Sequence, residues 1–67
     1  MNFCEALKAM QMGSKVSREA WRGEISHCYI PEYRDIITVK YPDGSEKTID
    51  FVFGSEDILA DDWWVVT

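Results

Sequence analysis

The segment IITVKYPDGSEKTIDFVF, residues 36–53, carries the clearest structural signal in the chain. Pro42 presets the backbone for the first corner of a turn, and Gly44 is free to adopt a positive φ. The flanking residues, 36–41 and 46–53, are rich in the β-branched and aromatic side chains that are typical of strands. The segment therefore predicts a β-hairpin. Alternation assigns to its inner face Ile37, Val39 and Tyr41 on the first strand and Ile49, Phe51 and Phe53 on the second.

An amphipathic helix is predicted ahead of the hairpin, over about residues 3–12. Asn2 and Glu5 have the spacing of a capping box, and Gly13 stands where a left-handed residue closes a helix. Hydrophobic side chains recur on one face of this helix, namely Phe3, Ala6, Leu7 and Met10.

The segment that follows the helix predicts little regular structure. Residues 15–17 are too short for an independent strand, and Ser17 is expected to cap a brief helical turn. Arg18 and Trp21 would then share one side of that turn, and Gly23 would let the chain bend sharply.

Two further strands are predicted, at residues 25–30 and 63–66. Between the hairpin and the last strand, Ser55 is expected to cap a single helical turn through residues 57–60. The fold class is therefore α+β. We expect one domain, residues 1–67, in which the N-terminal amphipathic helix packs on an antiparallel sheet of three or four strands.

Composition restricts the possible functions. A chain of 67 residues has a thin core, and its 46% hydrophobic residues favour a shared interface between copies. The net charge of −5 argues against a nucleic-acid polymer as partner, although a few local donors suffice for one small nucleotide. No apolar run approaches the roughly 20 residues that span a membrane, and no secretory signal is visible. We expect a soluble, cytoplasmic protein.

Catalytic and metal-binding patterns are weak. His27 and Cys28 are neighbours in a predicted strand, so their side chains point to opposite faces. With Cys4 they give three possible zinc ligands at unfamiliar spacing, where a structural site takes four. We therefore expect no enzyme activity, no metal and no cofactor. Of the C-terminal acids, at least one of Asp57 and Asp62 is expected to cap a helix N-terminus.

Arg18 and Trp21 leave two interpretations open. A guanidinium can hold a phosphate through two donors while an indole stacks on a purine, which together recognise an adenine nucleotide. Alternatively, Trp21 packs into the core and Arg18 pairs with an acidic neighbour. Spacing alone favours the second interpretation.

Three motifs resemble those of a known family of short phage and prophage proteins, the second type of Thoeris anti-defence protein. They cover the N-terminal 25 residues and the C-terminal part of the chain, and the middle is generic β-sequence. The motifs are Phe3-x-x-Ala6-Leu7, Gly13-x-x-Val16-x-Arg18-x-x-Trp21-x-Gly23 and Asp57-Ile58-Leu59-Ala60-x-Asp62-Trp63.

The resemblance implies a non-catalytic sponge in the host cytoplasm. Its protomers would form a homotetramer that binds a cyclic ADP-ribose isomer or, as in some members, a cyclic oligonucleotide. Carried over by motif, Trp21 would stack on a base or frame the pocket, and Arg18 and Gly23 would shape the loop. Asp57 would bind ligand hydroxyls or fix the C-terminal turn.

The chain departs from the family at two positions. The family often has Asn where this chain has Arg22, which would add a phosphate contact or block the pocket. It often has Ser or Thr where this chain has Gly54, and Ser55 would replace that hydroxyl one position later. A different class also fits the charge: a small acidic inhibitor that contacts a host enzyme directly and mimics nucleic-acid phosphates with Glu56, Asp57, Asp61 and Asp62.

Overall fold

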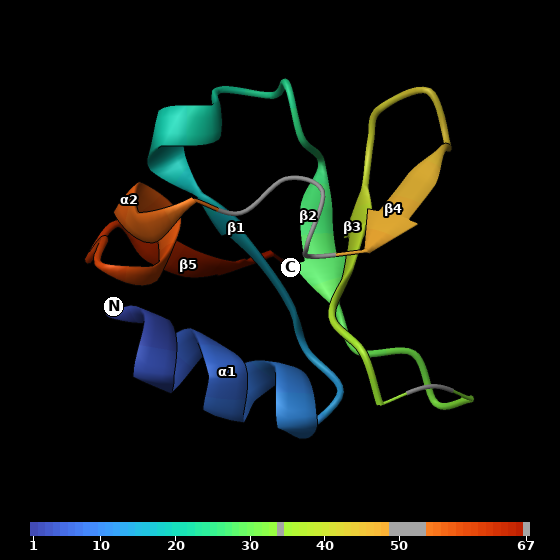
Figure 1. Ribbon diagram of the computed structural model, residues 1–67, viewed down its shortest axis with the longest axis horizontal. Helices are drawn as coiled ribbons and strands as arrows, with labels where there is room; N and C mark the ends of the chain where they lie inside the picture. Colours follow the sequence, from blue (N-terminus) through green and yellow to red (C-terminus); the bar gives the residue numbers. More distant parts are fainter. Residues whose placement is uncertain (34, 49–53, 67) are drawn as a thin grey trace.

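One helix packs against one face of a five-stranded antiparallel sheet in the computed structural model, which describes residues 1–33, 35–48 and 54–66 (Figure 1). This confirms the α+β class and the packing of the N-terminal helix. In chain order the elements are α1 (Phe3–Gln11), β1 (Lys15–Arg18), the short 3-10 helix η1 (Glu19–Trp21), β2 (His27–Tyr29), β3 (Thr38–Lys40), β4 (Glu46–Thr48), α2 (Ser55–Ile58) and β5 (Trp63–Val66).

The strands lie in the order β4-β3-β2-β1-β5, so the sheet has one strand more than the largest number predicted. The extra strand is Lys15–Arg18, and the expectation that this segment is too short to form a strand is wrong. It is stable because it has a neighbour on each side: Val16 lies opposite Cys28 of β2 and opposite Val65 of β5. A four-residue segment that cannot stand alone is held when both of its edges are hydrogen-bonded and it carries a buried side chain.

The predicted hairpin is present as β3 and β4, with Val39 opposite Lys47. The turn is closed by the Tyr41 N–H, which donates to the Ser45 carbonyl at 2.9 Å, and by Gly44 at a φ of 91°. The Asp43 carboxylate accepts the Ser45 N–H at 2.9 Å and pins the corner. The predicted alternation of Ile49, Phe51 and Phe53 lies outside the described residues.

Helix α1 has the predicted ends. The Asn2 side chain accepts the Glu5 N–H at 2.9 Å, and Glu5 accepts the Asn2 N–H at 3.0 Å. Gly13, at a φ of 91°, donates to the Met10 carbonyl, and Ser14 donates to the Ala9 carbonyl, as in a Schellman motif. The helix begins and ends where local chemistry alone can satisfy its free amides and carbonyls.

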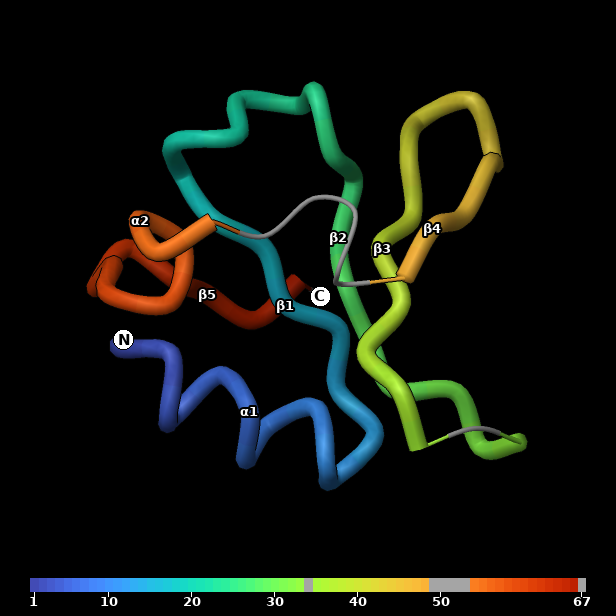
Figure 2. The backbone as a smooth tube through the Cα atoms, viewed as in Figure 1, coloured from blue at the N-terminus to red at the C-terminus, as the bar shows by residue number. Residues whose placement is uncertain are grey.

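The N-terminus lies beside the start of β5 (Figure 2). The Trp63 N–H donates to the Met1 carbonyl at 3.1 Å, and the Met1 amino group donates to the Trp63 carbonyl at 2.9 Å. The core lies between α1 and the sheet and consists of Ala6, Met10, Val16, Trp21, Cys28, Val39 and Trp63. Among the described residues, no helix is both long enough and apolar enough to cross a bilayer.

Candidate functional site

Arg18, the last residue of β1, pairs with two carboxylates from the C-terminal segment. Its Nη1 donates to Asp57 Oδ1 at 2.6 Å, and its Nε donates to Asp62 Oδ1 at 2.7 Å. The side chain of Arg18 is only 13% exposed. Hydrogen bonds to Asp62 and Asp57 outweigh burial and raise the pKa of Arg18 above its ordinary value. The second of the three motifs is thereby joined to the third.

Asp57 is the residue on which the two motifs converge. Its Oδ1 accepts both the Arg18 guanidinium and, at 3.2 Å, the indole N–H of Trp21. Its Oδ2 accepts the Gly54 N–H at 2.9 Å, and its main-chain carbonyl accepts the indole N–H of Trp63 at 3.0 Å. A carboxylate that holds a cation, a helix N-terminus and an indole at once fixes the geometry of the whole C-terminal turn.

This arrangement confirms the capping role predicted for the acidic residues and corrects its details. Gly54 is the N-cap of α2, Ser55 is the first helical residue, and the cap comes from Asp57 reaching back to the Gly54 amide. The prediction that Ser55 caps this helix is therefore wrong. Asp62 caps η1 in the same way from outside that helix, because its Oδ2 accepts the Ala20 N–H at 3.1 Å. The hydrogen bond from Arg18 holds the pKa of Asp62 below its ordinary value.

The sequence predicted that Arg18 and Trp21 share a helical turn. This prediction is wrong, because Arg18 ends β1 and Trp21 lies in η1. Arg18 is in extended conformation and precedes η1 without a side-chain cap from Ser17, which lies buried within β1. The two side chains meet because both donate to Asp57. The Trp21 ring is 9% exposed and lies edge-on to Trp63, with ring centroids 5.2 Å apart. This geometry agrees with the second of the two interpretations left open by the sequence, in which Trp21 packs into the core and Arg18 pairs with acidic residues.

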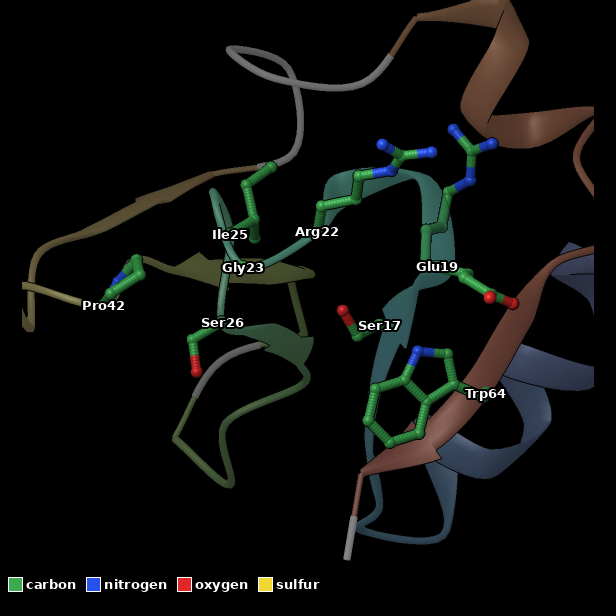
Figure 3. Close-up of a pocket in the computed structure, with 9 residues that line it drawn as sticks. Ser17, Glu19, Arg22, Gly23, Ile25, Ser26, Pro42 and Trp64 are labelled. Carbon is green, nitrogen blue, oxygen red and sulfur yellow. The ribbon is translucent and has the colours of Figure 1, made fainter.

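A groove of about 650 Å³ opens beside this cluster (Figure 3). It lies between the end of β1, the segment that follows η1, the hairpin turn and β5. Three of the predicted site residues, Arg18, Arg22 and Gly23, line it, while Trp21, Ser55 and Asp57 do not. The full lining is Ser17, Arg18, Glu19, Arg22, Gly23, Ile25, Ser26, Pro42 and Trp64.

Arg22 and Gly23 form a tight turn at the rim of this groove. Both have positive φ, 47° and 87°, and the Glu24 N–H closes the turn onto the Trp21 carbonyl at 2.9 Å. Arg22 is the one non-glycine residue in the described parts of the chain with a positive φ, which costs a residue with a Cβ roughly 1–2 kcal/mol. Such strain is found where the surrounding structure fixes a conformation. Here the fixed turn places the exposed side chain of Arg22 at the rim of the groove (Figure 3).

Trp64 lines the groove and was missed by sequence reasoning. Trp63 and Trp64 are consecutive in β5, so their rings lie on opposite faces of the sheet. Trp63 is 2% exposed and belongs to the core, while Trp64 is 47% exposed. Strand alternation could have identified Trp64 from the sequence, because a buried Trp63 places the next side chain on the opposite face.

The remaining reactive side chains lie elsewhere. Burial raises the pKa of the Cys28 thiol to about 12, so it is protonated at neutral pH. Desolvation and then the charges of Lys15 and Lys40 lower the pKa of His27. Neither residue lines the groove, and both cysteines are free. The groove's chemistry therefore comes from guanidinium, hydroxyl, carboxylate and indole groups, which bind ligands by charge, hydrogen bonds and stacking.

Comparison with known proteins gives one clear result. Among curated proteins, none matches the sequence significantly. The family model described as Tad2-like, Thoeris anti-defense 2-like domain, matches residues 1–66. The match includes the motifs of residues 13–23 and 57–63, which contact each other at Asp57. The chain therefore belongs to the Tad2-like family of Thoeris anti-defense 2-like domains.

Proposed function

We propose that this protein is a non-catalytic sponge that binds a cyclic ADP-ribose-type immune signal, or a cyclic oligonucleotide, and withholds it from a Thoeris effector. The family match over residues 1–66 carries this proposal. The groove supplies a place for the ligand, since its volume of about 650 Å³ lies within the range of small-molecule sites. Sequestration requires tight ground-state binding and gains nothing from transition-state stabilisation.

The groove offers what a cyclic dinucleotide-like ligand needs. The exposed Arg22 guanidinium can hold a phosphate through two donors, and the Arg22–Gly23 turn allows close approach of a ligand to the main chain. Arg18 also lines the groove, but its guanidinium is already paired with the carboxylates of Asp57 and Asp62. We therefore assign phosphate binding to Arg22 and the shape of the groove wall to Gly23 and Arg18.

The other predicted site residues take supporting roles in this proposal. Trp21 and Asp57 hold the end of β1 against α2 and so set the position of the turn that bears Arg22. Ser55 is exposed at the start of α2 and does not line the groove. It would meet a ligand only across an interface with a second copy.

We propose that the protein is a homo-oligomer, a tetramer by analogy with the family it resembles. Large apolar side chains remain exposed on a single copy, including Leu59 at 82%, Trp64 at 47% and Val65 at 39%. Strand β5 is at one edge of the sheet and contains no charged residue, whereas the strand at the other edge, β4, contains Glu46 and Lys47. An uncharged edge strand favours pairing with another chain. A second copy there would add a wall to the open groove.

The acidic-inhibitor alternative has less support. Asp57 and Asp62 are engaged with Arg18, so within the described residues of this segment only Glu56 and Asp61 present exposed carboxylates. Two exposed acids make a weak mimic of a phosphate backbone.

The test is calorimetric titration of the purified protein with a panel of cyclic ADP-ribose isomers and cyclic oligonucleotides. We expect saturable binding of at least one compound, and recovery of that compound chemically unchanged after heat denaturation of the complex. Recovery of a cleaved product would identify an enzyme, and binding of none of the panel would refute the sponge. Size-exclusion chromatography with light scattering gives the oligomeric state of the same sample.

A further inference from the structure

We propose that Trp64 is the stacking platform of the groove and that the ligand's purine base lies on its indole face. This inference rests on the proposed function and assigns a residue and a ligand group within that site. It transfers to Trp64 the role that the motif resemblance gave to Trp21.

The position of Trp64 leaves its ring open to the groove. Residues Ser17 and Trp64 are direct partners across β1 and β5, and Ser17 is a small, buried residue. A directly opposed pair on one face of a sheet is close enough for a large side chain to cover its neighbour. With serine as the neighbour, the indole extends over the strand with about half of its surface exposed (Figure 3).

The two other tryptophans are already engaged. The Trp21 and Trp63 rings are 9% and 2% exposed, and their indole N–H groups donate to the Asp57 carboxylate and carbonyl. Neither ring lines the groove. Trp64 is the one aromatic side chain among the described residues that does.

The groove therefore combines an aromatic face with a cation on a different wall. Figure 3 shows the Trp64 indole beside Ser17 on β5 and β1, while the Arg22 side chain extends from the turn that follows η1. A ligand that uses both groups carries an aromatic ring and a phosphate in one molecule. A purine nucleotide fits this description, and a sugar phosphate that lacks a base does not.

The experiment compares four proteins by calorimetric titration with the tightest-binding cyclic ADP-ribose isomer of the panel. The variants are Trp64→Ala, Trp64→Phe and a control, Met12→Ala, which removes a side chain that is 86% exposed beyond the end of α1 and does not line the groove. Loss of base stacking should weaken binding by Trp64→Ala about 5- to 150-fold. Trp64→Phe keeps a ring and should stay within about 5-fold of wild type, and Met12→Ala should bind as wild type does. Ribose 5-phosphate should not compete.

Fluorescence provides a second measurement that does not depend on a truncated side chain. Trp64 is the exposed indole of three, so acrylamide should quench its emission preferentially in the free protein. Saturation with the cyclic ADP-ribose isomer should protect it from acrylamide. In Trp64→Phe the protection should be absent while calorimetry still records binding.

The outcomes separate this inference from the proposed function. Binding by wild type together with unchanged binding by Trp64→Ala, or with no protection of the exposed indole, overturns the role of Trp64 and leaves the sponge intact. Absence of binding by wild type to every member of the panel overturns both.

Discussion

Replacing Asp57 with alanine should destabilise the protein more than any other change to an acidic residue of the C-terminal segment. The substitution removes the carboxylate that accepts the Arg18 guanidinium, the Trp21 indole N–H and the Gly54 N–H. Asp57 is 5% exposed, so water cannot readily replace these three bonds. The expected effect is on folding, and ligand binding would be lost with it.

The magnitude follows from the contacts. A hydrogen bond to a charged group contributes about 1.5–3 kcal/mol, and a buried N–H that loses its acceptor costs about 1–3 kcal/mol. The lost helix cap adds about 1 kcal/mol. Because Arg18 keeps Asp62 as a partner, we expect a net loss of about 3–5 kcal/mol, as for one partner removed from a buried ion pair. A domain of this size has a total stability of only about 3–10 kcal/mol.

Urea denaturation followed by circular dichroism and tryptophan fluorescence measures this loss. All variants should be compared at one protomer concentration, because assembly shifts the apparent stability. The matched control is Asp61→Ala, which removes an exposed carboxylate four residues later and should change stability by less than about 0.5 kcal/mol.

A small effect would refute this account of the motif. If Asp57→Ala loses less than about 1 kcal/mol, the three contacts do not hold the C-terminal turn. A double-mutant cycle with Arg18→Met adds a sharper criterion, because residues joined by a buried ion pair should show a coupling of about 0.5–3 kcal/mol. A coupling of zero would mean that the pair at 2.6 Å makes no net contribution.

Further predictions concern strain, reactivity and pH. Arg22→Asn should raise stability by up to about 1 kcal/mol in urea denaturation, because Asn adopts positive φ more readily than Arg, while calorimetry should record weaker phosphate binding. Maleimide labelling of the native protein should modify the exposed Cys4 quickly and the buried Cys28 only after unfolding, and rapid labelling of both would contradict the structure. His27 has a folded pKa below its ordinary value of 6.5, so stability is fully present above about pH 6.5 and falls as the pH drops toward the folded pKa; His27→Gln should remove that dependence. Asp62, whose folded pKa is also lowered, contributes stability above about pH 4 that is lost as pH falls further, and Asp62→Asn should flatten an acid denaturation curve in that range.

The hairpin turn and the ends of α1 could be predicted because their chemistry is local. A Pro-Asp-Gly turn, a capping box and a left-handed glycine are each determined by residues within five positions of one another, and each appears as expected. Strand β1 could not be predicted in this way. Its stability comes from its two neighbours, β2 and β5, and its partner residues on β5 lie about fifty positions away in the sequence.

For a similar reason, the sequence could not distinguish residues that line the groove from residues that stabilise the fold. Arg18 and Trp21 have the composition of a nucleotide site, and nothing in their spacing shows that Asp57, 36 or more residues later, accepts both of their N–H groups. The predicted roles of Arg22 and Gly23 stay predictions, but their place at the rim of a groove agrees with a role in binding. Trp64 could have been found from strand alternation once Trp63 was assigned to the core.

The motifs that identify the family and the residues that we propose to contact the ligand are largely different sets. Arg18, Trp21, Asp57 and Trp63 form one interlocked cluster, so a change in any of them disturbs the fold before it alters specificity. Arg22 and Trp64 lie outside that cluster, are exposed, and line the groove from separate elements. A scaffold of this kind can change its ligand by substitutions at the rim while its stabilising contacts stay the same. Arg22, which stands where the family that this chain resembles often has Asn, is the position where this protein's choice of ligand should be sought first.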